Sequence, residues 1–415
     1  MHSRLASACA LFALIVPAAA LAAGQSNEGF LHGSIRSDAG REYTGFLRWN
    51  TDEEAFWDDL FQSAKQDLPY LESVSEKDRE GGRPKKHTNI KIFGFKVNVE
   101  SDGWAGPGSR VFMARFGDIE SIAVTGSNAA RLTMKGGERI DVEGYANDVG
   151  ATILVRDAAL GDIELDWDKI DTIRFAAAPR GAEPGAQRLH GRLVTPQGEF
   201  TGFIQWDQEE CLTSDRLDGE TEDGDIALAM GSIARIERRS SQGCLVTLKD
   251  GREYVLRGTN DVNAENRGIM VEDPRYGRVV VAWREFDRLE FSESPTSGRA
   301  YGDYGRAKPL SGTVVTRDGK TRSGRLVYDL DEAASWELLN GDWRDLEYNL
   351  PFALIRRIEP GRDESRLVLR GGETLRLEGS QDVTADNDGL LVFDRGEADP
   401  IYLPWREVES IELAD

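Results

Sequence analysis

The chain has 415 residues, of which 73 are Asp or Glu and 51 are Lys or Arg, so its formal net charge is −22 at pH 7. This charge argues against a nucleic-acid partner, because binding to phosphates needs a basic surface. A chain of this length exceeds what one hydrophobic core accommodates and is expected to form roughly two to four domains.

The first 23 residues have the pattern of a secretory signal peptide. Arg4 supplies the positive charge, residues 5–16 form a short apolar stretch, and Ala20-Leu21-Ala22 is a small-residue cleavage pattern. The apolar stretch is too short to span a membrane as a helix. We therefore expect an exported protein, periplasmic or secreted, that has no transmembrane segment after signal cleavage.

Three stretches of the remaining chain resemble one another. The first begins GSIRSDAGREYTGFLRWN at Gly33, the second GRLVTPQGEFTGFIQWD at Gly191, and the third GTVVTRDGKTRSGRLVYD at Gly312. Residues 179–186 and 293–308 are rich in Gly, Pro, Ala and Ser, which is typical of linkers. We name the three predicted repeats region 1 (24–178), region 2 (187–292) and region 3 (309–415).

Short alternating apolar stretches, separated by turn residues, predict β-strands in all three regions. Asp250-Gly251 lies between two of these stretches and is typical of a hairpin, because glycine accepts a positive φ. We expect an all-β fold of three tandem repeats of about 100 residues. Each repeat is expected to be a pair of small SH3-like or Sm-like β-barrel modules. Three two-sheet β-sandwiches are the alternative.

Region 1 contains an insertion, expected at about residues 51–94. Trp49 and Ile119 are 70 residues apart, whereas the equivalent pairs in the other regions are 27 apart. The motif Thr51-x-x-Glu54 resembles a helix capping box, and Pro69 is expected to end or kink the helix. The apolar residues that suggest helical spacing are Phe56, Trp57, Leu60, Phe61, Ala64 and Leu68. Residues 88–100 then have the pattern of a strand pair or one long strand.

Two interpretations of the insertion stay open. In the first, the helix plugs the end of its own barrel, because an aromatic stripe at helical spacing is usually core. In the second, the helix and the basic loop at residues 76–87 form a docking surface for a protein partner or an anionic ligand. The candidate contact residues of this second interpretation are Phe56, Trp57, Phe61, Arg83, Lys85, Lys86 and Trp104.

A group of acidic residues recurs after the aromatic residue of each predicted repeat. Oxygen-rich loops of this kind can bind Ca²⁺, and the candidate ligands are Asp207, Glu209, Glu210, Asp329, Asp331 and Glu332. The same pattern also suits the N-cap of a helix, and we favour this structural role. No other metal and no cofactor is expected.

Cys211 and Cys244 remain after signal cleavage and could form a disulfide in an oxidising compartment. The sequence contains no recognisable catalytic motif. Trp49, Trp167, Trp206, Trp283 and Trp405 occupy repeat-equivalent positions, which favours a core role over sugar stacking.

These patterns lead to three functional hypotheses. We favour a non-enzymatic binding or scaffold protein of the bacterial cell envelope, which presents tandem β-modules to a protein partner, with the insertion as specificity element. The alternatives are a carbohydrate-active or metal-dependent enzyme that uses the acidic loops, and a structural protein stabilised by Ca²⁺. The sequence does not indicate the oligomeric state.

Overall fold

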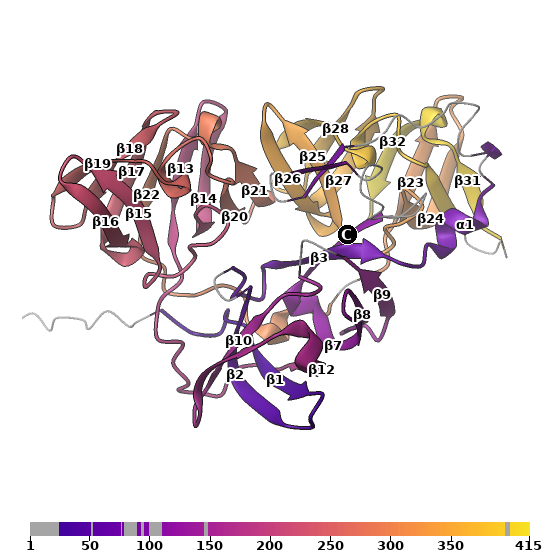
Figure 1. Cartoon of the computed structure of the whole chain (residues 1–415). Coiled ribbons are helices and arrows are strands. Elements are labelled where there is room, and N and C mark those ends of the chain that lie inside the picture. Colours follow the sequence, from indigo (N-terminus) through magenta and orange to yellow (C-terminus); the bar gives the residue numbers. More distant parts are fainter. Residues whose placement is uncertain are drawn as a thin grey trace, which may run out of the picture.

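The computed structural model describes residues 25–50, 53–75, 77–78, 89–92, 95–98, 110–144, 148–306, 308–394 and 399–415. Within these residues the fold is all-β, with two large antiparallel sheets, one separate hairpin and one short α-helix. Figure 1 shows region 2 on the left, region 3 on the right and region 1 below them. Neither large sheet closes into a barrel along the described strands.

Region 1 contains the α-helix and the hairpin β4–β5 as well as the ten strands of the first sheet. Its elements are β1 (His32–Ser37), β2 (Glu42–Trp49), β3 (Leu60–Lys65), α1 (Pro69–Ser73), β4 (Asn89–Ile92), β5 (Phe95–Asn98), β6 (Arg110–Arg115), β7 (Ile119–Gly126), β8 (Ala129–Met134), β9 (Arg139–Glu143), β10 (Ile153–Asp157), β11 (Gly161–Leu165) and β12 (Ile170–Phe175).

Regions 2 and 3 together form the 20-stranded sheet. The strands of region 2 are β13 (His190–Thr195), β14 (Gly198–Gln205), β15 (Arg216–Thr221), β16 (Gly224–Ala229), β17 (Ile233–Ser240), β18 (Gly243–Leu248), β19 (Glu253–Arg257), β20 (Ile269–Asp273), β21 (Gly277–Val281) and β22 (Arg288–Phe291). The strands of region 3 are β23 (Ser311–Thr316), β24 (Thr321–Tyr328), β25 (Leu338–Trp343), β26 (Leu346–Pro351), β27 (Ile355–Pro360), β28 (Glu364–Leu369), β29 (Thr374–Glu378), β30 (Leu390–Asp394), β31 (Ile401–Leu403) and β32 (Val408–Leu413).

The strands of each region pair in a corresponding order. Region 1 has the order β11-β10-β2-β1-β12-β7-β8-β9-β3-β6. The pairings of region 2 give β21-β20-β14-β13-β22-β17-β18-β19-β15-β16. Those of region 3 give β31-β30-β24-β23-β32-β27-β28-β29-β25-β26. Early and late strands of a region therefore pair with each other, for example β14 with β20.

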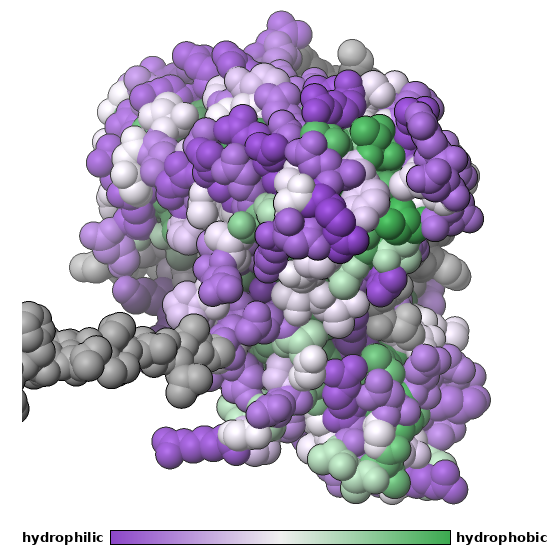
Figure 2. All heavy atoms as spheres, turned by 90° about the vertical axis from the view of Figure 1, so that its left-hand side faces the viewer, coloured by the Kyte–Doolittle hydropathy of each residue, from purple (hydrophilic) through white to green (hydrophobic). Residues whose placement is uncertain are grey.

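The large apolar side chains lie mainly in the core. The five tryptophans at equivalent positions are all in the core, with exposed fractions of 0–4 %: Trp49, Trp167, Trp206, Trp283 and Trp405. Their core role is therefore confirmed. Among the described residues, the exposed large hydrophobic side chains are Leu160 and Val255, and the face in Figure 2 is mostly hydrophilic, with small hydrophobic groups. No helix in the described part is long and apolar enough to cross a membrane.

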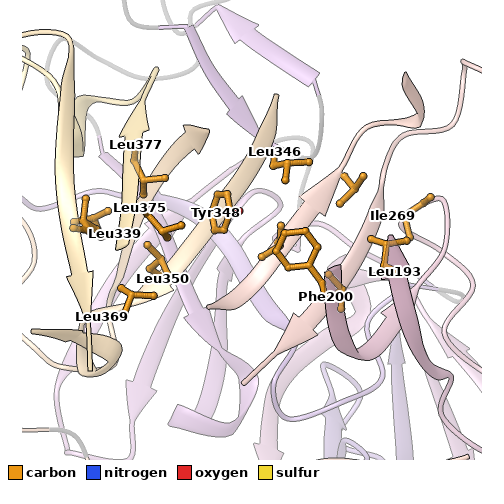
Figure 3. Close-up of a cluster of buried hydrophobic side chains, with 14 of the residues drawn as sticks. Leu193, Phe200, Ile269, Leu339, Leu346, Tyr348, Leu350, Leu369, Leu375 and Leu377 are labelled. Carbon is orange, nitrogen blue, oxygen red and sulfur yellow. The ribbon is translucent and has the colours of Figure 1, made fainter. Parts of the chain in front are cut away.

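Regions 2 and 3 join edge to edge. Strand β21 pairs antiparallel with β26, with Val279 opposite Tyr348. The Tyr348 ring lies 6.4 Å from Phe200 and 5.8 Å from Tyr276 of region 2. Figure 3 shows Tyr348 between the leucines of region 3 and Phe200. One continuous hydrophobic cluster therefore runs through both regions, and the backbone pairing makes this junction part of the fold.

The helix expected to begin near Thr51 is absent from residues 53–68, and this prediction was wrong. Leu60–Lys65 is strand β3, which pairs with β6. Four of its six residues are buried in succession, and two of them, Gln62 and Ser63, are polar. The apolar residues Leu60, Phe61 and Ala64 therefore have a spacing that a helix would also show, and periodicity did not distinguish the two. Pro69 does not end a helix but begins α1, where its missing N–H costs nothing.

Strand pairing also locates the additional chain of region 1. The β3–β6 pair corresponds to the hairpins β15–β16 and β25–β26, so the extra residues lie at about 66–109, after β3. The expected strand pair near residues 88–100 is present as β4–β5. Helix α1 does not plug region 1: it packs on region 3, where Leu68, Leu71 and Val74 form a cluster with Val327, Leu330 and Leu391 (Figure 1).

Candidate functional site

The recurring acidic residues form one tight turn in each region. We name residues 50 and 53–59, 207–215 and 329–337 the acidic turns. Each begins with a residue in the left-handed conformation, with φ of 46° at Asn50, 50° at Asp207 and 49° at Asp329. Asn and Asp tolerate this conformation better than most residues. The residues beyond the aromatic position therefore turn back at once and do not start a helix, so the helix-cap interpretation was wrong.

A carboxylate at the end of each acidic turn accepts two backbone N–H groups of the same turn. Asp59 accepts from Ala55 and Phe56, both at 2.9 Å. Asp215 accepts from residues 211 and 212 at 3.0 and 2.9 Å, and Glu337 from residues 333 and 334 at 2.6 and 2.8 Å. We name Asp59, Asp215 and Glu337 the closing carboxylates, because they satisfy donors that the turn leaves unpaired.

Each closing carboxylate also binds a cation from a different region. Arg278 of region 2 lies 2.9 Å from Asp59 of region 1. Arg48 of region 1 lies 2.8 Å from Asp215 of region 2. Lys65 of region 1 lies 3.1 Å from Glu337 of region 3 and 2.7 Å from the neighbouring Asp331. The acidic turn of every region is therefore a contact point for another region.

The contact between regions 1 and 2 is a buried network of charges. Arg188 bonds to Asp58 at 2.7 Å, and Arg115 lies 3.1 Å from Glu272. Glu272 also lies 2.6 Å from Arg278, which is 2 % exposed. Removing one member of such a network leaves an uncompensated buried charge. The network thus fixes the relative position of the two regions.

Cations of region 1 neutralise several buried carboxylates of region 3. Arg110 binds Asp388 and lies 2.8 Å from the side chain of Gln381. In region 2 the residue at the position of Asp388 is Arg267, which lies 2.5 Å from Glu209 within its own region. Burial lowers the pKa of Lys65, but Asp331 and Glu337 outweigh this effect and raise it above its ordinary value. Lys65 is therefore charged at every working pH.

A second recurring carboxylate in each region accepts a backbone N–H from the strand that follows the acidic turn. Asp148, Asp261 and Asp382 accept the backbone N–H of residues 62, 218 and 340 at 2.6–2.7 Å. Their carbonyl oxygens accept hydrogen bonds from Trp49, Trp206 and Tyr328. In the same loops the side chains of Asn266 and Asn387 accept the backbone N–H of Gly268 and Gly389, two residues further on, so they close turns.

One glutamate in each acidic turn has a buried carboxyl oxygen without a hydrogen-bond partner: Glu54, Glu210 and Glu332. Burial is the main cause that raises the pKa of each, and nearby carboxylates add to it. For Glu210 these neighbours are Asp261, Asp207 and Glu209, and the pKa rises to about 9. A buried carboxyl without a donor is most stable in its neutral form, so Glu210 is protonated near neutral pH.

The six Ca²⁺ candidates make contacts within the protein. Asp207 accepts from the backbone N–H of Arg267 at 2.5 Å, and Glu209 pairs with Arg267. Asp329 accepts from Gln381 at 2.9 Å, and Asp331 pairs with Lys65. Glu210 and Glu332 are the buried glutamates described above. In the described part of the chain no group of three or more His, Cys, Asp or Glu residues is arranged to hold a metal ion.

The three predicted docking residues that the structure describes are buried. Phe56, Trp57 and Phe61 are each 0 % exposed. They are core residues of region 1 and of its boundary with region 2, so the docking interpretation was wrong for these three. Their apolar spacing was interpreted as one face of a helix, whereas the structure has a buried turn and strand there. Arg83, Lys85, Lys86 and Trp104 lie outside the described residues.

Cys211 and Cys244 are both buried and both free, so the predicted disulfide is absent. Cys244 lies in the shared core of regions 2 and 3, whereas Cys211 packs in a separate cluster with Phe30 and Phe56 of region 1. Burial raises the pKa of both thiols, that of Cys244 to about 12. Such thiols are unreactive.

Sequence reasoning found the recurring carboxylates but missed the cations that bind them. Arg48, Lys65 and Arg278 occupy β2, β3 and β21, which are not equivalent positions. A repeat pattern therefore gave no signal for them.

Comparison with protein-family models, with curated proteins and with solved structures found no match for this chain.

Proposed function

We propose that this is a non-enzymatic binding or scaffold protein, exported to the bacterial cell envelope, which holds a protein partner on a rigid platform of three β-regions. The observation that carries the proposal is the use of an equivalent closing carboxylate in every region to bind a cation from another region. Such cross-links favour one fixed arrangement of surfaces, which is what a platform for a partner requires.

The same observation argues against acid chemistry in these turns. A catalytic carboxylate must reach substrate, whereas the closing carboxylates are occupied by backbone N–H groups and by cations. The glutamates with raised pKa are enclosed, with exposed fractions of 1 % for Glu54 and 9 % for Glu210. A role in folding explains them without a reaction.

We further propose that the three regions are tandem copies of one β-unit, each a pair of small SH3-like or Sm-like modules as expected from the sequence. The corresponding order of strand pairing supports this interpretation. The additional residues 66–109 interrupt the pattern in one copy, and we assign them the role of specificity element. Their helix α1 packs on region 3, so they connect two regions at the surface.

The test is affinity capture from the native cell envelope with residues 24–415 as bait. A second bait replaces residues 76–109 with a short Gly/Ser linker and keeps β3, α1 and β6. The control bait carries the same linker in the β15–β16 turn of region 2, the corresponding hairpin. We expect a protein that co-purifies in a fixed ratio with the intact and control baits but not with the second bait.

Two other results would count against the proposal. Failure of the intact bait to retain any protein, with binding of a sugar or metal instead, would overturn the scaffold function. Equal retention by all three baits would leave the scaffold function and would remove the specificity role from residues 76–109.

A further inference from the structure

A cleft of about 770 Å³ lies between regions 1 and 3. One wall is the segment from Lys65 to Glu72, which includes α1, and another is the turn between β8 and β9 of region 1. The third wall is the beginning of region 3 with its acidic turn. Figure 1 shows the elements that meet here, with α1 beside β24 and β31. The volume is in the range of sites that hold a ligand or a short peptide segment.

The lining combines apolar side chains with carboxylates. Tyr70 and Trp336 line the cleft and are half-buried, and Leu68 and Leu330 are buried in the cluster that holds α1 on region 3. The Trp336 ring packs edge-to-face on Phe112 at 6.0 Å, which holds it in place. Aromatic rings fixed in this way are good anchors for an apolar side chain.

The charge of the lining is negative. Seven carboxylates line the cleft against four cations. Lys65 is already bound to Asp331 and Glu337, and the guanidinium of Arg325 lies on the ring of Phe393 at 3.5 Å.

Three of these carboxylates are available at the cleft. Asp67, Glu72 and Glu138 are exposed and form no ion pair with another described residue. An opposite charge on a partner would find them unoccupied.

We propose that this cleft binds a Lys- or Arg-rich segment of the protein partner, with cationic groups on Asp67, Glu72 and Glu138 and an apolar side chain on Tyr70 and Trp336. The inference rests on the proposed function, because it names the partner's chemistry and the place where it binds. Charge complementarity selects the occupant: the lining repels anionic ligands and attracts a basic segment. A second hollow in the described part of the chain, bounded by Gly126–Ala129 and Val149–Ala151, is lined mainly by small residues and offers no comparable set of charges.

The test uses a fluorescent oligopeptide of alternating Lys and Tyr, with an oligopeptide of alternating Glu and Tyr as comparison. The cleft variant is Asp67→Asn, Glu72→Gln and Glu138→Gln. The matched control neutralises three exposed carboxylates on the β15–β16 turn of region 2, by Glu222→Gln, Asp223→Asn and Asp225→Asn. Both variants change the net charge equally. Fluorescence anisotropy gives the affinity, and circular dichroism confirms that both variants fold.

We expect wild type and control to bind the Lys/Tyr peptide equally and the cleft variant to bind it about tenfold more weakly, since each exposed pair contributes modestly. Equal affinity of all three proteins, equal losses in both variants, or equal binding of the Glu/Tyr peptide would overturn the inference. If the cleft variant melts early, the pair Asp67→Asn and Glu138→Gln takes its place.

The envelope capture distinguishes this inference from the function on which it rests. A partner retained by the wild-type bait and lost from the cleft variant supports both. A partner retained equally by both baits overturns the cleft as its site and leaves the scaffold function. Absence of any partner from the wild-type bait overturns the scaffold function itself.

Discussion

Replacing the buried Glu210 by Gln is expected to stabilise the protein at neutral pH. Glu210 is 9 % exposed, and one of its carboxyl oxygens has no hydrogen-bond partner. Burial and the neighbouring Asp261 raise its pKa from 4.5 to about 9 in the folded state. Gln has nearly the same shape and carries no ionisable proton. The substitution therefore removes the free-energy cost of keeping residue 210 protonated in the folded state.

The sign and the size follow from linkage. Below pH 4.5 both folded and unfolded chains hold the proton, and the substitution has little electrostatic effect. As pH rises from 4.5 to about 9, the unfolded chain loses the proton and the folded chain keeps it, so the wild-type protein becomes less stable. Each pH unit costs about 1.4 kcal/mol, which gives an advantage of about 3 kcal/mol for Glu210→Gln near pH 7.

The assay is urea unfolding followed by tryptophan fluorescence at several pH values between about 4.5 and 8. The expected result is a difference in unfolding free energy that is near zero at the acidic end and grows with pH. The control is Glu209→Gln, which removes an ion pair with Arg267 at 2.5 Å and should lower stability slightly. A Glu210→Gln variant less stable than wild type near pH 7, or a difference that does not grow with pH, would refute the reasoning.

Three further outcomes are expected. Lys65→Met should lower the urea-unfolding free energy by about 3–5 kcal/mol, because it leaves two buried carboxylates unpaired, whereas exposed Lys308→Met should change it little. Gly202→Ala should destabilise by about 1–3 kcal/mol in the same assay, since its Cβ would collide with the carbonyl oxygen of Glu272, and Gly136→Ala, in open space, should be nearly neutral. Cys211 and Cys244 should react with a thiol reagent only after unfolding, and a reductant should not shift the melting temperature.

The all-β class and many of its turns were predictable from residue types. Asp250 and Gly251 join β18 and β19 as expected, with Gly251 at a φ of 89°. The tryptophans at equivalent positions are core, since large apolar residues that recur with the fold serve the fold. The strand β3 was misread because its apolar residues Leu60, Phe61 and Ala64 have helical spacing, while the buried residues between them, Gln62 and Ser63, are polar and gave no strand alternation.

The candidate site was predictable only in part, because its carboxylates recur in all three regions whereas its cations do not. The carboxylates belong to the pattern that the regions have in common, and comparing the regions located them. The cations are single features: Arg48, Lys65 and Arg278 have different positions, and each serves a neighbouring region. A contact between regions cannot repeat when each region has a different neighbour, so internal comparison could not reveal it.

This asymmetry also indicates where function is best sought. Features shared by all three regions explain the fold, and the acidic turns, the buried glutamates and the core tryptophans are of this kind. The cleft between regions 1 and 3 arises only where the extra residues of region 1 place α1 on region 3. Its exposed carboxylates Asp67 and Glu72 belong to those extra residues. We therefore propose this cleft as the partner's binding site, because it is particular to one pair of regions and its exposed carboxylates form no ion pair with another described residue.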